Sequence, residues 1–195
     1  MKVVGIDLAG SEKRETGFCV LDEKLRAETC ILFKDKEIIE EVKKVKPEVI
    51  SIDAPLALPK GRPSLSKKYK NYPHLRECDK ELLKMKIKFF PITLGPMRKL
   101  TERGIRLKKI FEKMGFEVIE SFPGAAQDIL KIPRRKEKEK LRKGLIKIGI
   151  KGIKKEISEH ELDAITSAFV GKLYLEGNYL AIGDPKEMLI ILPKV

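Results

Sequence analysis

The sequence predicts an α/β fold in which helices flank a mixed sheet, and two patterns support this prediction. Three strand-like runs follow one another at the start of the chain and are separated by short polar turns, which favours antiparallel pairing. After them, amphipathic helical stretches alternate with short apolar runs, as in units where a helix connects two parallel strands. We therefore expect a sheet that begins antiparallel and continues with parallel strands.

The first quarter of the chain supplies four of the strands and one helix. β-Branched and other apolar residues, which favour strands, cluster at 3–8, 17–21, 27–33 and 49–53. Between the third and fourth runs, apolar residues recur at helical spacing among charges. This spacing predicts an amphipathic helix over 36–46, which Pro47 ends.

Residues 55–91 differ from the rest of the chain because prolines and basic side chains are frequent there. We expect an inserted, largely irregular segment with one helix near 75–85. Long irregular segments in compact domains are usually functional or mobile. The basic side chains of this insert are therefore candidate substrate contacts: Arg62, Lys67, Lys68 and Lys70.

The second half predicts two further helices, one strand and a hairpin. A helix begins at Gly95-Pro96, and a strand at 118–121 follows it. Ser158 and Glu161 have capping-box spacing, which predicts that another helix begins there. The mixed-charge run 134–140 is more typical of a solvated helical face than of a contact surface. The last predicted feature is a hairpin formed by 179–182 and 188–192.

Composition limits the classes of partner and compartment. The 195 residues include 42 Lys and Arg against 29 Asp and Glu, a net charge of +13 that favours polyanionic partners, nucleic acid first among them. Charged residues make up 36%, and their Lys and Glu excess also fits the ion-paired surface of a thermophile protein. Three scattered cysteines and no secretory signal indicate an intracellular, cytoplasmic protein. No apolar run is long enough for a membrane helix.

Three acidic residues each end an apolar run and precede a turn: Asp7, Asp53 and Glu120. A carboxylate in such a place is expensive to bury unless a proton, a cation or a donor compensates it. If the three strands lie side by side and parallel, these carboxylates converge at one edge of the sheet. Clustered carboxylates in a basic protein predict a site for hard divalent cations. The alternative is three unrelated acids that cap helices or pair with lysines.

The order of elements resembles the ribonuclease-H-like fold. In that fold the first strand is central and the fourth and fifth join it on one side, which implies a five-stranded sheet of order 3-2-1-4-5. The resemblance also implies that the last helix brings Asp163 to the edge that holds the other acids. We expect a single domain over 1–195, with 55–91 as an insertion and a C-terminal hairpin.

A set of ordered motifs is similar to the domain of unknown function 429 family, whose members are predicted nucleases. The similarity spans nearly the whole chain and rests on Gly5–Gly10, Ile52–Leu56, Arg76–Asp79, Phe90–Pro91, Glu120–Ala126 and Asp163–Ala164. The stretch from His160 to Ala164 also resembles the terminal helix of Holliday-junction resolvases. The chain departs from the ribonuclease H pattern because its first helix lacks an obvious glutamate ligand.

The resemblance implies phosphodiester cleavage with Mg²⁺ or Mn²⁺. Asp7 would bridge two ions, while Asp53 and Asp163 would each hold one. Glu120 would either bind metal or support the site from outside. His160, one helical turn before Asp163, would bind metal or move protons, or else simply face solvent.

Arg76 and Asp79 share one helical face, so Arg76 either forms an intrahelical ion pair or meets a substrate phosphate near the carboxylates. Nucleic acid is the expected substrate, and the sequence does not distinguish DNA from RNA. Two other functions stay open: a catalytically silent nucleic-acid-binding or scaffold protein, and a metal-dependent enzyme acting on a small phosphorylated substrate. Sugar kinases and actin-like ATPases, which share a related strand order, need two such domains, and this chain is long enough for one.

Overall fold

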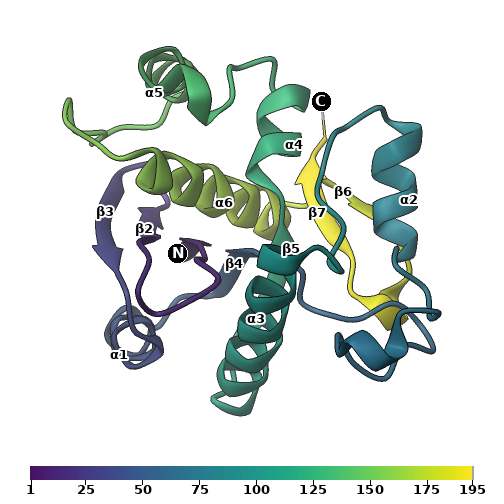
Figure 1. Cartoon of the computed structure of the whole chain (residues 1–195). Coiled ribbons are helices and arrows are strands. Elements are labelled where there is room, and N and C mark those ends of the chain that lie inside the picture. Colours follow the sequence, from purple (N-terminus) through teal and green to yellow (C-terminus); the bar gives the residue numbers. More distant parts are fainter. Residues whose placement is uncertain (195) are drawn as a thin grey trace.

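One mixed sheet of seven strands runs through the molecule, in the order β3-β2-β1-β4-β5-β7-β6 (Figure 1). The computed structural model describes residues 1–194, so the last residue of the expected 1–195 domain lies outside it. The strands are β1 Lys2–Asp7, β2 Thr16–Asp22, β3 Ala27–Leu32, β4 Val49–Asp53, β5 Glu117–Ser121, β6 Tyr179–Ile182 and β7 Ile190–Pro193. Each lies where the sequence predicts one, and the order 3-2-1-4-5 is observed for the first five.

The expected count of five strands is wrong, because the C-terminal hairpin extends the sheet. Strand β7 pairs parallel with β5 and antiparallel with β6. The parallel pairing uses only the last two residues of β5, Glu120 and Ser121. A pairing of two residues leaves no recognisable pattern in the sequence. The sequence therefore predicts the hairpin but not its pairing with β5.

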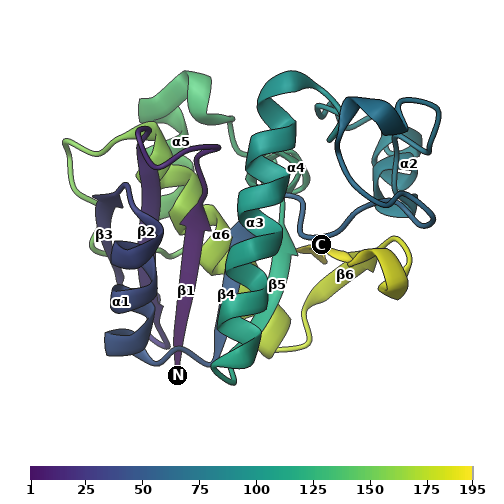
Figure 2. The same cartoon turned by 60° about the horizontal axis from the view of Figure 1, so that its bottom comes forward.

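Of the six helices among residues 1–194, five divide between the two faces of the sheet, and α2 Glu77–Lys84 lies beside the C-terminal hairpin (Figure 1). The other five are α1 Asp35–Val45, α3 Gly95–Lys113, α4 Pro123–Ile129, α5 Lys138–Lys147 and α6 Glu159–Leu175. Helix α6 lies against one face, with α4 and α5 packed beside it, while α1 and α3 cover the other face (Figure 2). None of the helices among residues 1–194 is both long and apolar enough to cross a membrane.

Alternate residues of the central strands enter two different cores, one on each face. Val3 of β1 and Ile119 of β5 pack with α6, whereas Val4 and Ile6 of β1 pack with α1 and α3. A strand buried on both faces has a continuous apolar sequence rather than an alternating one. This explains why the sequence identifies these strands but does not show which side chain faces which helix.

Helix α6 makes its closest approach to the sheet at two glycines. A Cβ on Gly5 would lie 2.1 Å from the backbone oxygen of Ala164, and a Cβ on Gly17 would lie 2.1 Å from that of His160. Both glycines therefore let the helix backbone rest directly on β1 and β2. This contact places the first turns of α6 beside the end of β1.

The predicted capping box fixes where α6 begins. The Ser158 hydroxyl accepts the Glu161 N–H at 3.1 Å, and the Glu161 carboxylate accepts the Ser158 N–H at 3.0 Å. The second oxygen of Glu161 accepts the hydroxyl of Thr29 on β3 at 2.8 Å. The cap is thus tied to the sheet, which aligns the helix start with the strand ends.

The 55–91 insert is largely irregular, as expected, with a short 3₁₀ helix η1 Lys67–Tyr69 and the helix α2. It lies beside the C-terminal hairpin (Figure 1). Glu187, in the 3₁₀ turn η3 Pro185–Glu187, is buried and accepts the backbone N–H groups of Lys60 at 2.5 Å and Glu77 at 2.7 Å. These charge-assisted bonds fasten the first part of the insert and the start of α2 to the hairpin.

The Gly5 contact leads to a first prediction. Gly5→Ala forces the new methyl group against helix backbone, so we expect it to reduce the free energy of unfolding by about 2 kcal/mol or more. Gly95→Ala is the matched control, because a Cβ there meets nothing within 4 Å. Urea denaturation of both variants measures the difference, and equal stability of the two would contradict the close packing of α6.

Candidate metal centre

Two strands and one helix bring three carboxylates together. Asp7 and Asp53 are the last residues of β1 and β4, and the parallel register pairs them directly. Asp163 lies in the second turn of α6. One carboxylate oxygen from each residue lies within 4.8 Å of the other two. The structure therefore assembles the cluster that the sequence analysis expected for these three residues.

Glu120 does not join this cluster, and the expected convergence of all three strand-end acids is wrong for it. In the parallel register Ser121, not Glu120, lies level with Asp53, while Glu120 lies level with Ile52. Because side chains alternate between the faces of a strand, Glu120 points away from α6. Ser121 takes the position on the α6 side, where its hydroxyl lies 3.1 Å from that of Ser167.

Arg76 forms a buried, bidentate ion pair with Glu120. Its two terminal nitrogens donate to the carboxylate at 2.7 Å each, and the Leu56 N–H donates to the same group at 2.8 Å. Arg76 also contacts Asp79 at 3.3 Å, and it is only 1% exposed. Burial raises the pKa of the Glu120 carboxyl, and the Arg76 guanidinium opposes that rise.

The expectation that Arg76 meets substrate phosphate does not fit this arrangement, because its donors are already bound to carboxylates and solvent is excluded. The intrahelical pairing with Asp79 that the sequence suggested is present. The stronger partner, Glu120, is 44 residues away in the chain. Arg76 therefore links the start of α2 to the end of β5.

Arg62 is a second expected substrate contact that the structure uses differently. It is buried, and its guanidinium donates to the backbone oxygens of Ser64, Tyr72 and Pro73 at 3.0 to 3.1 Å. It holds the insert's own loop together. The other three basic residues are exposed on or next to η1 and lie outside the set that lines the cleft described below: Lys67, Lys68 and Lys70.

Three side chains position the clustered carboxylates. His160 Nδ1 lies 2.7 Å from Asp7 Oδ2, and Gln127 Nε2 donates to Asp163 Oδ1 at 2.8 Å. Arg135, in the 3₁₀ helix η2 Arg135–Glu137, lies 3.5 Å from the second oxygen of Asp163 and is 47% exposed. His160 thus contacts a cluster ligand rather than simply facing solvent.

The sequence analysis missed Gln127 and Arg135. Gln127 is a lone buried amide in a short helix of small residues, which is the one signal that could have marked it. Arg135 belongs to the mixed-charge run 134–140, whose later part does begin the solvated helix α5. The run therefore divides, with its first residues at the site and the rest in solvent.

Uncompensated negative charge defines the electrostatics of the cluster. Burial, followed by repulsion from Asp7 and Asp163, raises the pKa of Asp53 well above its usual value. Burial and the charge of Asp7 raise the pKa of Asp163 to about 7. The hydrogen bond to Asp7 raises the pKa of His160. Carboxyl groups with raised pKa values signal a place where an added cation is favoured.

A cleft of about 1530 Å³ opens beside the cluster. It lies at the carboxyl ends of the parallel strands, and the insert forms one of its walls. That wall includes Lys86, Lys88 and Phe90, while Arg135 and Lys136 of η2 line another part. The acids of the centre are therefore accessible from a large, partly basic groove.

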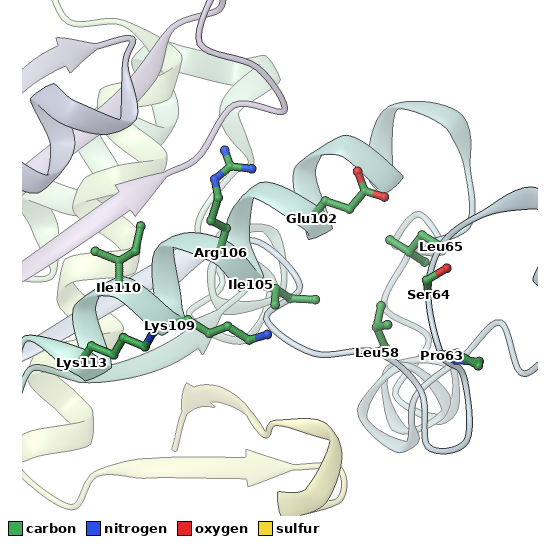
Figure 3. A pocket seen from close by; sticks show the side chains of 10 residues that line it. All are labelled: Leu58, Pro63, Ser64, Leu65, Glu102, Ile105, Arg106, Lys109, Ile110 and Lys113. Atoms are coloured by element: carbon green, nitrogen blue, oxygen red, sulfur yellow. The ribbon is translucent and has the colours of Figure 1, made fainter.

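A smaller cavity of about 480 Å³ lies between the outer side of α3 and residues 58–65 of the insert (Figure 3). Its lining mixes apolar side chains such as Leu58 and Ile105 with three cations, Arg106, Lys109 and Lys113. Glu102 is the one carboxylate among its lining residues. It has no cluster of acids, so the larger cleft is the candidate site.

Comparison with solved structures identifies the architecture. Thermus thermophilus RuvC in complex with a Holliday junction substrate superimposes with a TM-score of 0.54 at 15% identity, covering 91% of this chain and 96% of that one. The fold is ribonuclease-H-like. A second Thermus thermophilus RuvC structure matches with the same coverage and TM-score at 14% identity. No protein-family model matches the sequence, and no curated protein sequence matches it.

The cluster of three carboxylates leads to a prediction about stability and pH. The raised pKa of Asp53 means that its carboxylate destabilises the fold as pH rises above about 4, where an unfolded Asp loses its proton. Asp53→Asn should therefore stabilise the metal-free protein at pH 8 and have almost no effect on its stability at pH 4. Denaturation in chelator at both pH values tests this. Glu15→Gln, which alters an exposed acid of the same cleft, should show no such difference.

The buried ion pair between Arg76 and Glu120 leads to a further prediction about stability. Arg76→Met leaves Glu120 buried without its cation, so the loss of stability should be about 3–5 kcal/mol. Adding Glu120→Gln to that variant should recover part of the loss, since the orphaned charge is then removed. Urea titrations of the two single variants and the double variant provide the comparison. Strictly additive losses would show that the two side chains do not act as a pair.

Proposed function

We propose that this chain is a metal-dependent nuclease, a single ribonuclease-H-like domain of the domain of unknown function 429 family. One observation carries the proposal: Asp7, Asp53 and Asp163 place three ligand oxygens within 4.8 Å of one another at the floor of a large cleft. The RuvC likeness supports the fold, and one of those RuvC structures holds a Holliday junction substrate. The net charge of +13 fits a polyanionic substrate.

The donor set fits Mg²⁺ or Mn²⁺. Both ions prefer carboxylate oxygens, and all three ligands are carboxylates. Burial, followed by repulsion from Asp7, raises the pKa of Asp163 to about 7 although Gln127, Arg135 and His160 oppose the rise. When bound, a divalent ion would supply Lewis-acid stabilisation of a phosphoryl oxygen and a water of lowered pKa.

The remaining residues of the centre hold these ligands in place. His160 orients Asp7 through its Nδ1 contact, and it can hold a proton at that nitrogen when the carboxylate is otherwise unneutralised. Gln127 fixes one oxygen of Asp163, and the other oxygen lies 3.5 Å from Arg135. Arg135 is exposed enough to exchange Asp163 for a substrate phosphate. In this proposal Glu120 supports the site from outside it.

The size of the cleft favours a polymeric substrate over a small phosphorylated one. Small-molecule sites usually measure about 300–1000 Å³, and this cleft measures about 1530 Å³. Lys67, Lys68 and Lys70 are proposed as outer contacts to the polymer, since they are exposed beyond the cleft. DNA and RNA are both compatible with this arrangement.

Cleavage assays with Mn²⁺ and Mg²⁺ on single-stranded, duplex, hybrid and branched DNA and RNA test the proposal. Asp7→Asn should reduce cleavage by more than about 100-fold and weaken calorimetric Mn²⁺ binding, because it removes a shared ligand. Glu15→Gln makes the same charge change at the cleft rim and should leave both unchanged. If the wild-type protein cuts none of these substrates, a catalytically silent binding protein becomes the better account.

A further inference from the structure

The wall of the cleft that the insert forms exposes a large aromatic side chain. Phe90 is 71% exposed, more than any other large hydrophobic residue among residues 1–194, and it lines the cleft. Its neighbour Phe89 instead packs on the core beneath the insert. The sequence similarity singled out Phe90 and Pro91, and the metal centre gives Phe90 no role.

The backbone around Phe90 is anchored rather than loose. Ile87, on one side, is 6% exposed, and Ile92, on the other, is 1% exposed. The Ile87 N–H also donates to the backbone oxygen of Leu82 in α2 at 2.9 Å, so the segment is tied to the last turn of that helix. The phenyl ring is thus held in the cleft by a segment whose two ends are buried, and it is solvated although burial would be favourable.

Three lysines line the same cleft as this ring. Lys86 and Lys88 are exposed on the same wall, and Lys99 on α3 also lines the cleft. Within residues 1–194 none of these three ammonium groups forms a salt bridge, in contrast to Lys80, which contacts Glu77 at 2.5 Å. An exposed aromatic ring beside unpaired cations is the combination that binds single-stranded nucleic acid, where bases stack and phosphates pair with lysine.

We propose that this wall binds an unpaired segment of nucleic acid, with Phe90 stacked on a base and Lys86 and Lys88 at the neighbouring phosphates. The proposal rests on the proposed nuclease function for its location, since it places the strand in the cleft that contains the carboxylates. A base in a regular duplex has both faces covered by its neighbours, so the ring selects unpaired or frayed segments. The substrate class is therefore single-stranded or locally opened nucleic acid.

The absence of tryptophan from the chain allows a direct test. Phe90→Trp creates a single fluorophore at the proposed stacking position, and Phe33→Trp creates one at a residue that is 39% exposed but outside the cleft lining. Both proteins are titrated with oligothymidylate, oligouridylate and a blunt hairpin duplex in chelator, so that no cleavage occurs. We expect single strands to quench the fluorescence of the Phe90→Trp protein, the duplex to quench it far less, and the Phe33→Trp control to show no change.

Two further variants separate stacking from charge. Phe90→Ala should weaken single-strand affinity by about tenfold with an unchanged salt dependence, since it removes a stacking surface. Lys86→Gln with Lys88→Gln should flatten the slope of affinity against salt. Phe90 is exposed, so its replacement leaves the core intact, and thermal melting of each variant confirms this.

Unchanged fluorescence of the Phe90→Trp protein, under conditions where anisotropy shows bound oligonucleotide, would overturn the proposal, and so would equal quenching by duplex. A signal from this variant that changes with protein concentration alone would also overturn it, since the patch would then join two copies of the chain. Quenching by single strands without cleavage in Mn²⁺ supports this binding mode while removing the nuclease proposal. Cleavage by the wild-type protein without quenching in the Phe90→Trp variant would support the nuclease proposal and overturn this binding mode.

Discussion

The contact between the backbone of α6 and the glycines of β1 and β2 is the constraint on which the candidate site depends. Hydrophobic packing is non-directional, so it leaves a helix some freedom to slide on a sheet. The backbone oxygens of Ala164 and His160 instead occupy the space that side chains at Gly5 and Gly17 would fill, which sets the depth and position of the helix. Asp163 is therefore carried to a fixed place beside Asp7, as a metal centre requires.

The distribution of buried arginines explains why neither Arg76 nor Arg103 neutralises the carboxylate cluster. Arg76 is committed to Glu120 and Asp79, and Arg103, which is 2% exposed, donates to Asp35 at 2.7 Å and to three backbone oxygens. Both cations fasten loops to the sheet rather than neutralise the cluster. Arg135 reaches the centre only from the exposed side, at 3.5 Å from Asp163. In a basic protein, the acids of the cleft are thus left for a cation from solution.

The sequence predicted the elements well because their signals are local. Apolar runs located every strand, the capping box located the start of α6, and the acids at the ends of β1 and β4 pointed to the candidate site. Helix α4 was not predicted. The failures are non-local. The face on which Glu120 lies depends on a one-residue register between β4 and β5, and the partner of Arg76 lies 44 residues away. The position of Gln127 against Asp163 depends on how α4 packs on α6, which no local pattern specifies.

Asp53 and Glu120 show how the same local pattern can serve two purposes. Asp53 is the last residue of β4 and lies level with Asp7, whereas Glu120 is the last but one of β5 and lies one residue short of that level. Because successive side chains of a strand point to opposite faces, Asp53 lies on the side of α6 beside Asp7 and Asp163. Glu120 lies on the other side, where it pairs with Arg76. Since Arg76 immediately precedes α2, this ion pair ties the insert to the strand next to β4. The wall that carries Phe90 and the edge that carries the acids are therefore held in a fixed relation by two carboxylates from adjacent strands.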